Sequence, residues 1–179
     1  MDEKNMVILV NKETDEAIGI EEKMKAHDKE NGKWHRAISV FIFNDKGETM
    51  MQQRDREKYH SGEKWSNTCC SHPMPGESVI DSAHRRLVEE MGFDCEMHEA
   101  FVFPYEADVG SGLREREYDH IIFGRYNGTP KPDPKEVQDW KWIGLEELRS
   151  EIGKKPEEFT AWLRLMIDEV IRQYKNEQL

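Results

Sequence analysis

The chain has 179 residues, 35% of them charged, and its 26 basic and 37 acidic side chains give a formal net charge of −11. An acidic balance argues against a general nucleic-acid-binding protein, because such a protein needs a basic surface. No apolar run approaches the roughly 18 to 20 residues of a membrane span, and the first residues lack the pattern of a secretory signal. We expect one cytoplasmic domain over residues 1–179, with reduced cysteines and no membrane or nucleic-acid partner.

The first third of the chain is typical of short strands and one hairpin. Four segments have the β-branched or alternating composition of strands: 6–10, 16–20, 34–43 and 48–54. The polar turn at 44–47 predicts that the last two of these segments form a hairpin. Residues 21–26 are expected to form a short helix or a turn.

A helix is predicted over residues 78–91, and Gly92 suits its C-terminal end. Its apolar positions recur at spacings close to 3.6 residues: Val79, Ile80, Ala83, Leu87 and Met91. The remaining strands are expected at 93–107, 113–126 and 140–144, and the remaining helices at 145–152 and from Pro156 to about Tyr174. The proline-rich segment 129–136 is expected to be an exposed loop. Because helices interrupt the hairpins, the predicted fold class is α/β (α+β), a sandwich around a mixed sheet.

A divalent metal site is suggested by two carboxylates and three histidines. Glu115 and Glu117 are two residues apart on a predicted strand, so their side chains point to the same face. A solvated charged strand is the ordinary interpretation of such a pair. His27, His35 and His72 lie on three other segments, and each alone is more often a surface or hydrogen-bonded histidine. Together, the five side chains suit an octahedral site for Mn²⁺, Mg²⁺ or Zn²⁺.

A reactive thiol is suggested by the segment SNTCCSHP, in which Cys69 and Cys70 precede His72. Structural zinc is not expected, because no second pair of Cys or His has zinc-finger spacing. A cysteine is most often buried and inert. Cys70, however, falls in a predicted polar loop beside candidate metal ligands, where thiol chemistry fits.

Charged residues on the 78–91 helix suggest a phosphate site. Arg86 and Glu90 are four residues apart, and one ordinary interpretation is a surface ion pair worth only about a few tenths of a kcal/mol. Together with Arg54 and Lys58, Arg86 also suits a cationic pocket for a diphosphate. Glu90 would then hold Mg²⁺ against the phosphate oxygens.

The segment from Glu77 to Phe93 resembles the Nudix box, G-x5-E-x7-R-E-U-x-E-E-x-G-U, where U is an apolar residue. Two positions depart from it: Ser71 replaces the first Gly, and Arg86 replaces the Glu of the R-E pair. Loss of that carboxylate weakens the metal cluster with which Nudix hydrolases cut diphosphates, whereas a cation can hold an intact diphosphate. The resemblance therefore implies a non-hydrolytic member with the Nudix-like α/β/α sandwich.

The wider chain, from about Met6 to Trp162, is similar to type 1 isopentenyl-diphosphate isomerases. The similar segments are WHRAISVFIFN, WSNTCCSHP and the E-x-E of Glu115 and Glu117. The resemblance implies three catalytic residues: Cys70, Glu117 and Tyr105. It implies the metal ligands His27, His35, His72, Glu115 and Glu117, with Glu90 for a second Mg²⁺ bound with the substrate. It implies the substrate contacts Arg54, Lys58, Arg86 and Trp162.

The implied reaction interconverts isopentenyl and dimethylallyl diphosphate by adding a proton to one carbon and removing a proton from another. Cys70 would lie on one side of the five-carbon chain, with Glu117 and Tyr105 on the other. Trp162 would stabilise a cationic intermediate by roughly 2 kcal/mol or more, although packing in the last helix is its ordinary role. Two other functions stay open: a Nudix hydrolase of a nucleoside diphosphate derivative, and a non-catalytic metal or isoprenoid-diphosphate binding protein. The native metal and the choice between monomer and homodimer also stay open.

Overall fold

The computed structural model of the chain describes residues 5–177. Its strands are β1 (Met6–Val10), β2 (Ala17–Glu22), β3 (His35–Phe43), β4 (Glu48–Arg54), β5 (Trp65–Ser66), β6 (Cys69–Ser71), β7 (Met97–Gly110), β8 (Leu113–Arg125) and β9 (Val137–Gly144). Its helices are α1 (Lys23–Ala26), α2 (Val79–Met91), α3 (Leu145–Lys154) and α4 (Ala161–Glu177), with a 3-10 turn η2 (Pro156–Glu158) before α4.

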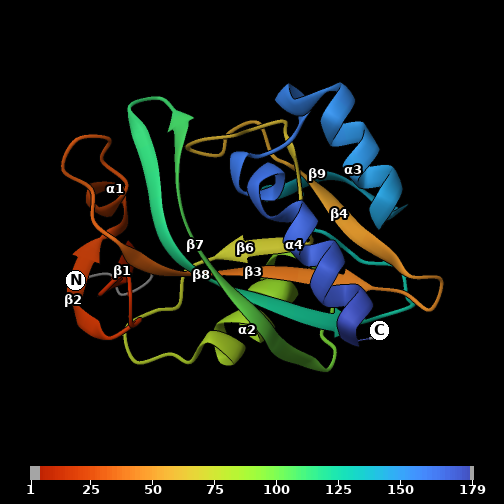
Figure 1. The fold of residues 1–179 in the computed structure, drawn as a ribbon, viewed down its shortest axis with the longest axis horizontal. Coiled ribbons are helices and arrows are strands. Elements are labelled where there is room, and N and C mark those ends of the chain that lie inside the picture. Colours follow the sequence, from red (N-terminus) through yellow and green to blue (C-terminus); the bar gives the residue numbers. More distant parts are fainter. Residues whose placement is uncertain (1–4, 178–179) are drawn as a thin grey trace.

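Strand β3 is the centre of the sheet. It pairs in parallel with β8 along its whole length, from His35 opposite Glu117 to Phe43 opposite Arg125. Its other edge is shared, because β6 pairs with the middle of β3 while β1 and β4 each meet one end. The long β7–β8 hairpin rises from the sheet, and its tip lies beside the loop that follows α1 (Figure 1).

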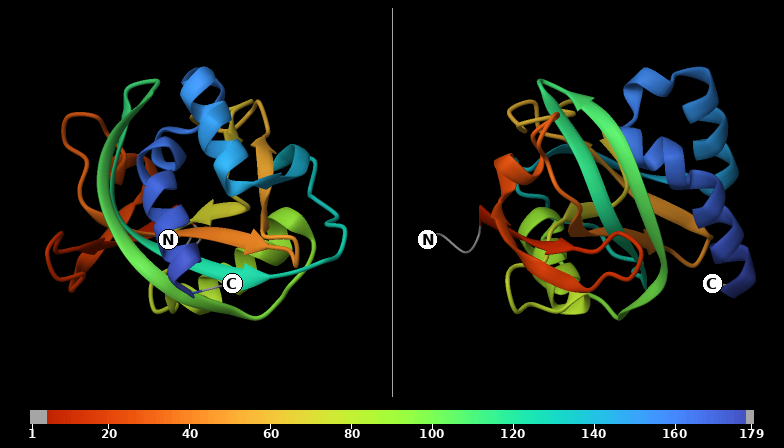
Figure 2. Two further views of the ribbon diagram at one scale, coloured as in Figure 1. Left: turned by 45° about the vertical axis from the view of Figure 1, so that its right-hand side comes forward. Right: turned by 60° about the vertical axis from the view of Figure 1, so that its left-hand side comes forward.

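Helices cover both faces of β3. Successive side chains of a strand point to opposite faces, so Val40 and Ile42 pack in the core beneath α2 while Phe41 and Phe43 pack in the core beneath α3 and α4. Figure 2 shows α3 and α4 on one side of the sheet and α2 on the other. A strand buried on both faces is apolar along its length, which explains the strong strand signal at 34–43. The predicted α/β (α+β) sandwich around a mixed sheet is confirmed.

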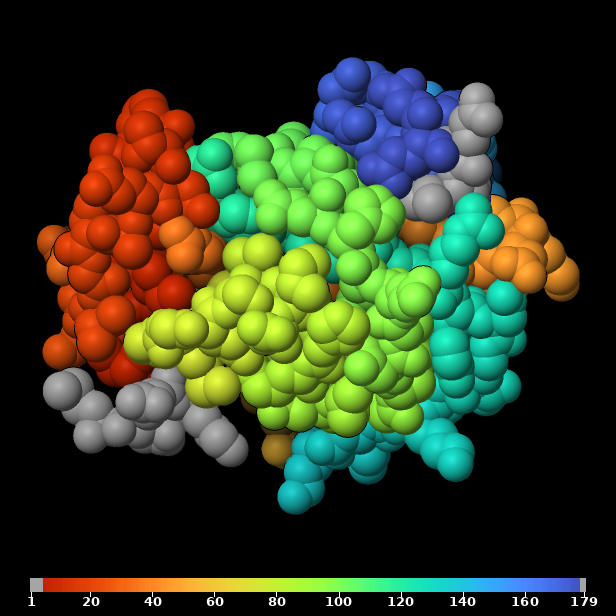
Figure 3. Space-filling view, turned by 90° about the horizontal axis from the view of Figure 1, so that it is seen from below, coloured from red at the N-terminus to blue at the C-terminus, as the bar shows by residue number. Residues whose placement is uncertain are grey.

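Helix α2 begins and ends at the residues that its sequence predicts. Ser78 is the N-cap, and its hydroxyl accepts a hydrogen bond from the backbone N–H of Asp81 at 3.0 Å. Gly92 ends the helix with a φ of 73°, and any side chain there would clash with the carbonyl oxygen of Lys131. Figure 3 shows the face of the molecule on which α2 and the loop before it lie beside the N-terminal strands.

The prediction that the final helix opens at Pro156 is wrong. Residues 156–158 form a separate 3-10 turn, and α4 begins only at Ala161. Between them, Phe159 bridges to Trp65, and the backbone N–H of Thr160 donates to the Trp65 carbonyl at 3.0 Å. The chain therefore leaves the helical conformation in order to pair with β5.

One strand pairing and the starts of two strands also differ from the predictions. The predicted hairpin of β3 with β4 closes only at Phe43 opposite Thr49, because β8 and β6 occupy the edges of β3. Strand β4 pairs instead along its length with β9, which begins at Val137 rather than at residue 140. Strand β7 begins at Met97 rather than at Phe93, since the Phe93 ring stacks on Tyr126 in the core beneath α2.

Two segments predicted as loops are more ordered than expected. In 129–136, Pro130 is buried, and the backbone N–H groups of Lys131 and Asp133 donate to the last turn of α2. The segment SNTCCSHP is not a polar loop, because it runs from the end of β5 through β6, and its first four residues, 66–69, are completely buried. Among residues 5–177, no helix has the length and apolar character needed to cross a membrane.

Candidate active site and metal centre

Four of the five predicted metal ligands converge at one end of the β3–β8 pair. His27 follows α1, His35 opens β3, His72 follows β6 and Glu117 lies on β8. The parallel register places His35 directly opposite Glu117. Each of the four offers one ligand atom, and these atoms lie within 4.8 Å of one another.

Two of the imidazoles are oriented as metal ligands usually are. Nδ1 of His27 donates to the carbonyl of Lys23, and Nδ1 of His35 donates to the carbonyl of Lys33, both at 2.8 Å. Their buried Nε2 atoms have no hydrogen-bond partner and lie 3.6 and 3.5 Å from Glu117 Oε1. A backbone carbonyl on Nδ1 leaves the Nε2 lone pair free for a metal. The donor set fits a divalent cation.

The charge states of His72 and Glu117 also suit a metal. Nε2 of His72 lies 2.9 Å from Glu117 Oε1. Burial lowers the pKa of His72 from 6.5 to about 3, so its imidazole is neutral. Burial would raise the pKa of Glu117, but the surrounding imidazoles hold it well below its ordinary value. Neutral imidazoles and an ionised carboxylate are the forms that bind metals.

We expect the metal-free protein to lose stability as the pH falls from 6.5 toward about 3. The pKa of His72 is lower in the folded chain than in the unfolded chain, so across this range the unfolded chain binds an extra proton. The lowered pKa of Glu117 acts in the same direction. Denaturant unfolding of chelator-treated protein at decreasing pH measures the slope, and His72→Gln should reduce it. An identical slope in the variant would contradict this assignment.

Glu115 lies beside the four-residue group rather than in it. It shares a face of β8 with Glu117, as predicted, and the Tyr105 hydroxyl lies 2.8 Å from Glu115 and 2.6 Å from Glu117. Its carboxylate forms a second group of ligand atoms with His27 and His60. Burial and the charge of Glu117 raise the pKa of Glu115 well above its ordinary value. Without a metal, therefore, Glu115 gives up its proton less readily than Glu117 does.

The Cys70 thiol and the Glu117 carboxylate line one narrow cavity. The other polar and aromatic side chains of this cavity are Ser39, Arg54, Tyr59, His60, Ser71, His72, Tyr105, Glu115 and Trp162. Its volume is about 30 Å³, the share of one water molecule in the liquid, so a larger ligand requires lining side chains to move. Burial raises the pKa of Cys70 to about 12. The sulfur is therefore a neutral thiol near pH 7.

Trp162 and Arg54 form part of the wall beside Cys70. The indole Nε1 lies 3.2 Å from the Cys70 sulfur. The guanidinium carbon of Arg54 lies 5.2 Å from the centre of the Trp162 ring, within cation–π range. Arg54 is 7% exposed and also donates to the His60 carbonyl at 3.2 Å. Arg54 is thus a buried cation at the inner end of the site.

Lys58 and Arg86 line an open, polar cleft of about 670 Å³ outside the cavity. The cleft and the cavity share Tyr59, Ser71 and His72. An anionic group in the cleft would therefore lie next to a small group in the cavity. This arrangement suits a ligand with one highly charged end and one small end.

Acidic side chains hold Arg86 in place. Arg86 forms ion pairs with Glu90, with Glu89 at 2.7 Å and with Glu136 at 3.5 Å, and Glu136 also pairs with Lys58. Burial would raise the pKa of Glu90, but Arg86 and Lys58 lower it. Glu90 belongs to neither group of metal-binding atoms found among residues 5–177. The structure thus brings Glu90 to the cleft cations rather than to the histidines.

Sequence reasoning missed four residues that surround the site. Lys23 lines the cleft, Tyr59 lies between cleft and cavity, His60 lies 3.4 Å from Glu115, and Asn67 lies against Cys70. Tyr59 and His60 directly follow Lys58 in the sequence, which was a usable signal. Asn67 lies in the same segment as Cys70, three residues before it, which was also a usable signal. Lys23 carried no local signal, because folding brings it to the site from another segment.

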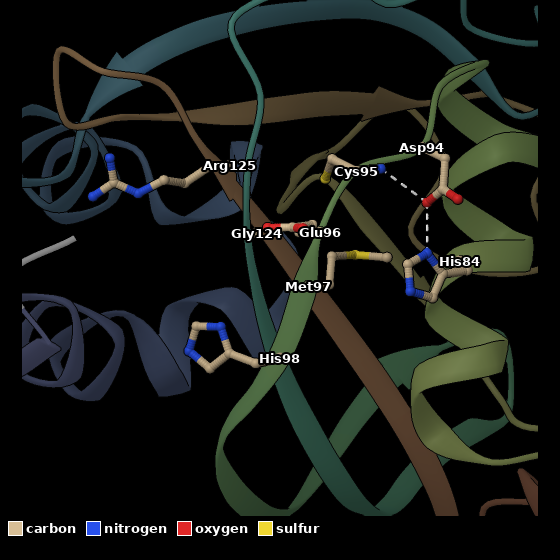
Figure 4. A pocket seen from close by; sticks show the side chains of 8 residues that line it. All are labelled: His84, Asp94, Cys95, Glu96, Met97, His98, Gly124 and Arg125. Atoms are coloured by element: carbon tan, nitrogen blue, oxygen red, sulfur yellow. Dashed lines mark hydrogen bonds and ion pairs between the residues drawn. The ribbon is translucent and has the colours of Figure 1, made fainter.

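A second hollow, away from these residues, is lined by the middle of α2, the loop after it, the start of β7 and the end of β8 (Figure 4). Its residues are His84, Asp94, Cys95, Glu96, Met97, His98, Gly124 and Arg125. It is open and holds an exposed pair, in which His84 Nδ1 lies 2.6 Å from an Asp94 oxygen. Neither group of metal-binding atoms found within residues 5–177 falls here. We therefore place the candidate active site at the β3–β8 end.

Comparison with known proteins agrees with this architecture. The NUDIX domain family matches residues 33–163. A crystal structure of DR0079 from Deinococcus radiodurans superposes with a TM-score of 0.76, covers 92% of this chain and 98% of its own, and is 17% identical. At that identity, the likeness concerns the fold alone. The chain is a Nudix-domain protein.

Relatives with higher sequence identity show to which family of Nudix-domain proteins the chain belongs. Isopentenyl-diphosphate Delta-isomerase 2 of Aromatoleum aromaticum is 49% identical over 168 residues, which cover 94% of this chain and 87% of the relative. The isopentenyl-diphosphate Delta-isomerase of Pectobacterium atrosepticum is 43% identical and covers 96% of both chains. The chain belongs to the isopentenyl-diphosphate Delta-isomerase family, as the sequence resemblance predicted.

Proposed function

We propose that this chain is an isomerase that interconverts isopentenyl diphosphate and dimethylallyl diphosphate. One observation carries the proposal most directly: a neutral thiol, Cys70, and an ionised carboxylate, Glu117, line the same narrow cavity. Moving a double bond requires a proton donor and a proton acceptor at neighbouring carbons of one substrate. The membership of the chain in the isomerase family supports the same reaction.

The protonation states of Cys70 and Glu117 suggest which group donates a proton and which accepts one. The Cys70 thiol would give its proton to the terminal methylene of isopentenyl diphosphate, leaving a tertiary carbocation at C3. The Glu117 carboxylate, hydrogen-bonded by Tyr105, would take a proton from C2, and the new double bond forms between C2 and C3. An alkene is a weak base, so both groups must be close to the substrate and shielded from water. The reverse reaction exchanges the two roles.

The cavity walls would protect and stabilise the carbocation. The Trp162 ring lines the cavity, and the attraction of an indole ring for a cation is worth roughly 2 kcal/mol once water is excluded. The negative charge on Glu117 adds electrostatic stabilisation. The narrow cavity leaves little room for water, which would otherwise trap the carbocation as an alcohol.

We infer that a divalent metal is held by His27, His35, His72 and Glu117, with Glu115 next to them. When bound there, the metal would polarise the carboxyl group of Glu117 as a Lewis acid. Three imidazole donors favour Mn²⁺ or Zn²⁺ over Mg²⁺, which prefers all-oxygen ligands. We further propose that the substrate diphosphate enters with Mg²⁺ and occupies the cleft lined by Lys58 and Arg86, and that Glu90, which pairs with Arg86, holds the Mg²⁺.

Deuterium incorporation tests the proposed function. Incubation with isopentenyl diphosphate in D₂O, with Mg²⁺ and Mn²⁺, is expected to give labelled dimethylallyl diphosphate, detected by NMR. Released phosphate or nucleotide, from this or a nucleoside diphosphate substrate, would instead identify a Nudix hydrolase. Bound metal without label or product would identify a non-catalytic binding protein. Either of these two results would overturn the proposal.

Replacement of Arg86 by Gln is expected to raise KM for isopentenyl diphosphate by about 10-fold to 100-fold. The variant removes a charge-assisted contact to the diphosphate, worth about 1.5–3 kcal/mol. It also leaves the buried Glu90 carboxylate without its main cation, so the pKa of Glu90 should rise. Steady-state kinetics measure the change. Arg149→Gln is the matched control, because Arg149 pairs with Glu146 and Asp168 away from the cleft. An unchanged KM in Arg86→Gln would remove Arg86 from the binding site.

A further inference from the structure

Asn67 lies at the centre of the hydrogen bonds around Cys70, although it has no assigned role. It follows β5, and its side chain is completely buried. A buried amide between two active-site side chains calls for an explanation, because each of its polar atoms must find a partner.

The orientation of the Asn67 amide is determined by its surroundings. Its Nδ2 group donates to the carbonyl of Val40 at 3.1 Å and to the carbonyl of Cys69 at 2.9 Å. These two acceptors use both amide hydrogens. The opposite orientation would set the amide oxygen against two carbonyl oxygens. The Oδ1 atom must therefore face the other way, toward Cys70.

Three donors converge on Asn67 Oδ1. The Cys70 thiol lies 3.0 Å away, the Ser66 hydroxyl 3.0 Å and the Trp162 indole Nε1 3.1 Å. The same indole N–H is 3.2 Å from the Cys70 sulfur, so it is shared between oxygen and sulfur. One oxygen atom thus holds both the thiol and the ring that face the cavity.

We propose that Asn67 is a positioning residue of the active site, which holds the Cys70 thiol and the Trp162 ring in a fixed relation to the bound alkene. Its oxygen accepts the S–H hydrogen bond, so the thiol cannot rotate freely before substrate binds. When the thiol has given its proton to the alkene, the indole N–H of Trp162 can donate its hydrogen bond to the thiolate sulfur instead of sharing it with the Asn67 oxygen. The catalytic role of Asn67 in this inference rests on the isomerase function proposed above, whereas its hydrogen bonds do not depend on that function.

Vibrational spectroscopy tests the geometry without turnover. The difference between the infrared spectra of the wild type and Cys70→Ala isolates the S–H stretch of Cys70 from those of Cys69 and Cys95. We expect the wild-type band at the lowered frequency of a hydrogen-bonded thiol. In Asn67→Leu, which has a similar shape but no acceptor, the band should move to higher frequency. A free-thiol frequency in the wild type would overturn the proposal even if the variant fails to fold.

Kinetics test the catalytic consequence. In Asn67→Leu we expect kcat to fall by about 10²-fold, because loss of orientation in a reacting group has effects of this size. KM should change little, since Asn67 lines neither the cleft nor the cavity. Thr68→Val is the matched control: its hydroxyl makes two buried hydrogen bonds, to Met50 and Ile42, without touching Cys70. Wild-type kcat in Asn67→Leu, or an equal loss in Thr68→Val, would overturn the proposal.

The two proposals fail in different ways. A hydrogen-bonded S–H band in a protein that never labels its substrate would overturn the proposed function, and with it the catalytic part of this inference. Normal turnover with a free S–H band would overturn the role of Asn67 while leaving the isomerase function intact.

Discussion

Replacement of Cys70 by Ala is expected to lower kcat for isomerisation by about 10²- to 10⁴-fold, the usual contribution of a positioned acid or base. Alanine removes the only proton that the thiol can offer to the alkene. The substitution creates little packing strain, because Cys70 is partly exposed to the cavity rather than part of a close-packed core. Circular dichroism should therefore be unchanged, and deuterium incorporation measures the loss.

Cys69→Ala is the matched control for this prediction. Cys69 is the neighbouring residue on β6, but its side chain points to the opposite face and is completely buried in the core beneath α2. We expect a modest loss of stability in this variant and a kcat close to that of the wild type. Retention of more than about a tenth of wild-type kcat in Cys70→Ala would exclude the thiol as the proton donor.

Replacement of Glu117 by Gln is expected to have two large effects. It removes the ionised carboxylate that would bind the metal together with His27, His35 and His72. The affinity for Mn²⁺ or Zn²⁺ should therefore fall by at least about 10²-fold. It also removes the proposed proton acceptor, so kcat should fall by about 10²- to 10⁴-fold. Titration calorimetry measures the first effect and deuterium incorporation the second.

Metal binding should also stabilise the wild-type fold, and Glu117→Gln should abolish that gain. A ligand at 100 times its Kd stabilises a folded protein by about 2.7 kcal/mol. We therefore expect Tm to rise when Mn²⁺ or Zn²⁺ is added to chelated wild type, but not in the variant. Glu106→Gln is the matched control, since Glu106 lies on β7 and pairs with Arg114 and Arg116 at the surface. Equal metal-dependent shifts of Tm in the wild type and in Glu117→Gln would show that the metal does not bind at this site.

Much of the fold could be predicted because its signals are local. Helix α2 follows from the spacing of its apolar residues and from Gly92 at its C-terminal end. The common face of Glu115 and Glu117 follows from the two-residue period of a strand, and the shared Tyr105 hydroxyl confirms it.

Other elements could not be predicted because distant partners determine them. Strand β4 pairs with β9 rather than along β3, since β8 and β6 take the edges of β3. The start of α4 is delayed because residues 159–160 pair with β5. Neither segment contains a sequence pattern that identifies the strand with which it pairs.

The amino-acid sequence alone predicted which thiol, imidazoles, carboxylates and cations would form the site. These predictions depend on the types of residue and on their order along the chain, which are the two features that this chain shares with the family. Folding determined the rest. It raised the pKa of Cys70 and of Glu115 and lowered the pKa of Glu117, because burial and neighbouring charges act only in three dimensions. It also brought Lys23 to the cleft, His60 to Glu115 and the Trp162 indole to Asn67, since these contacts join segments far apart in the sequence.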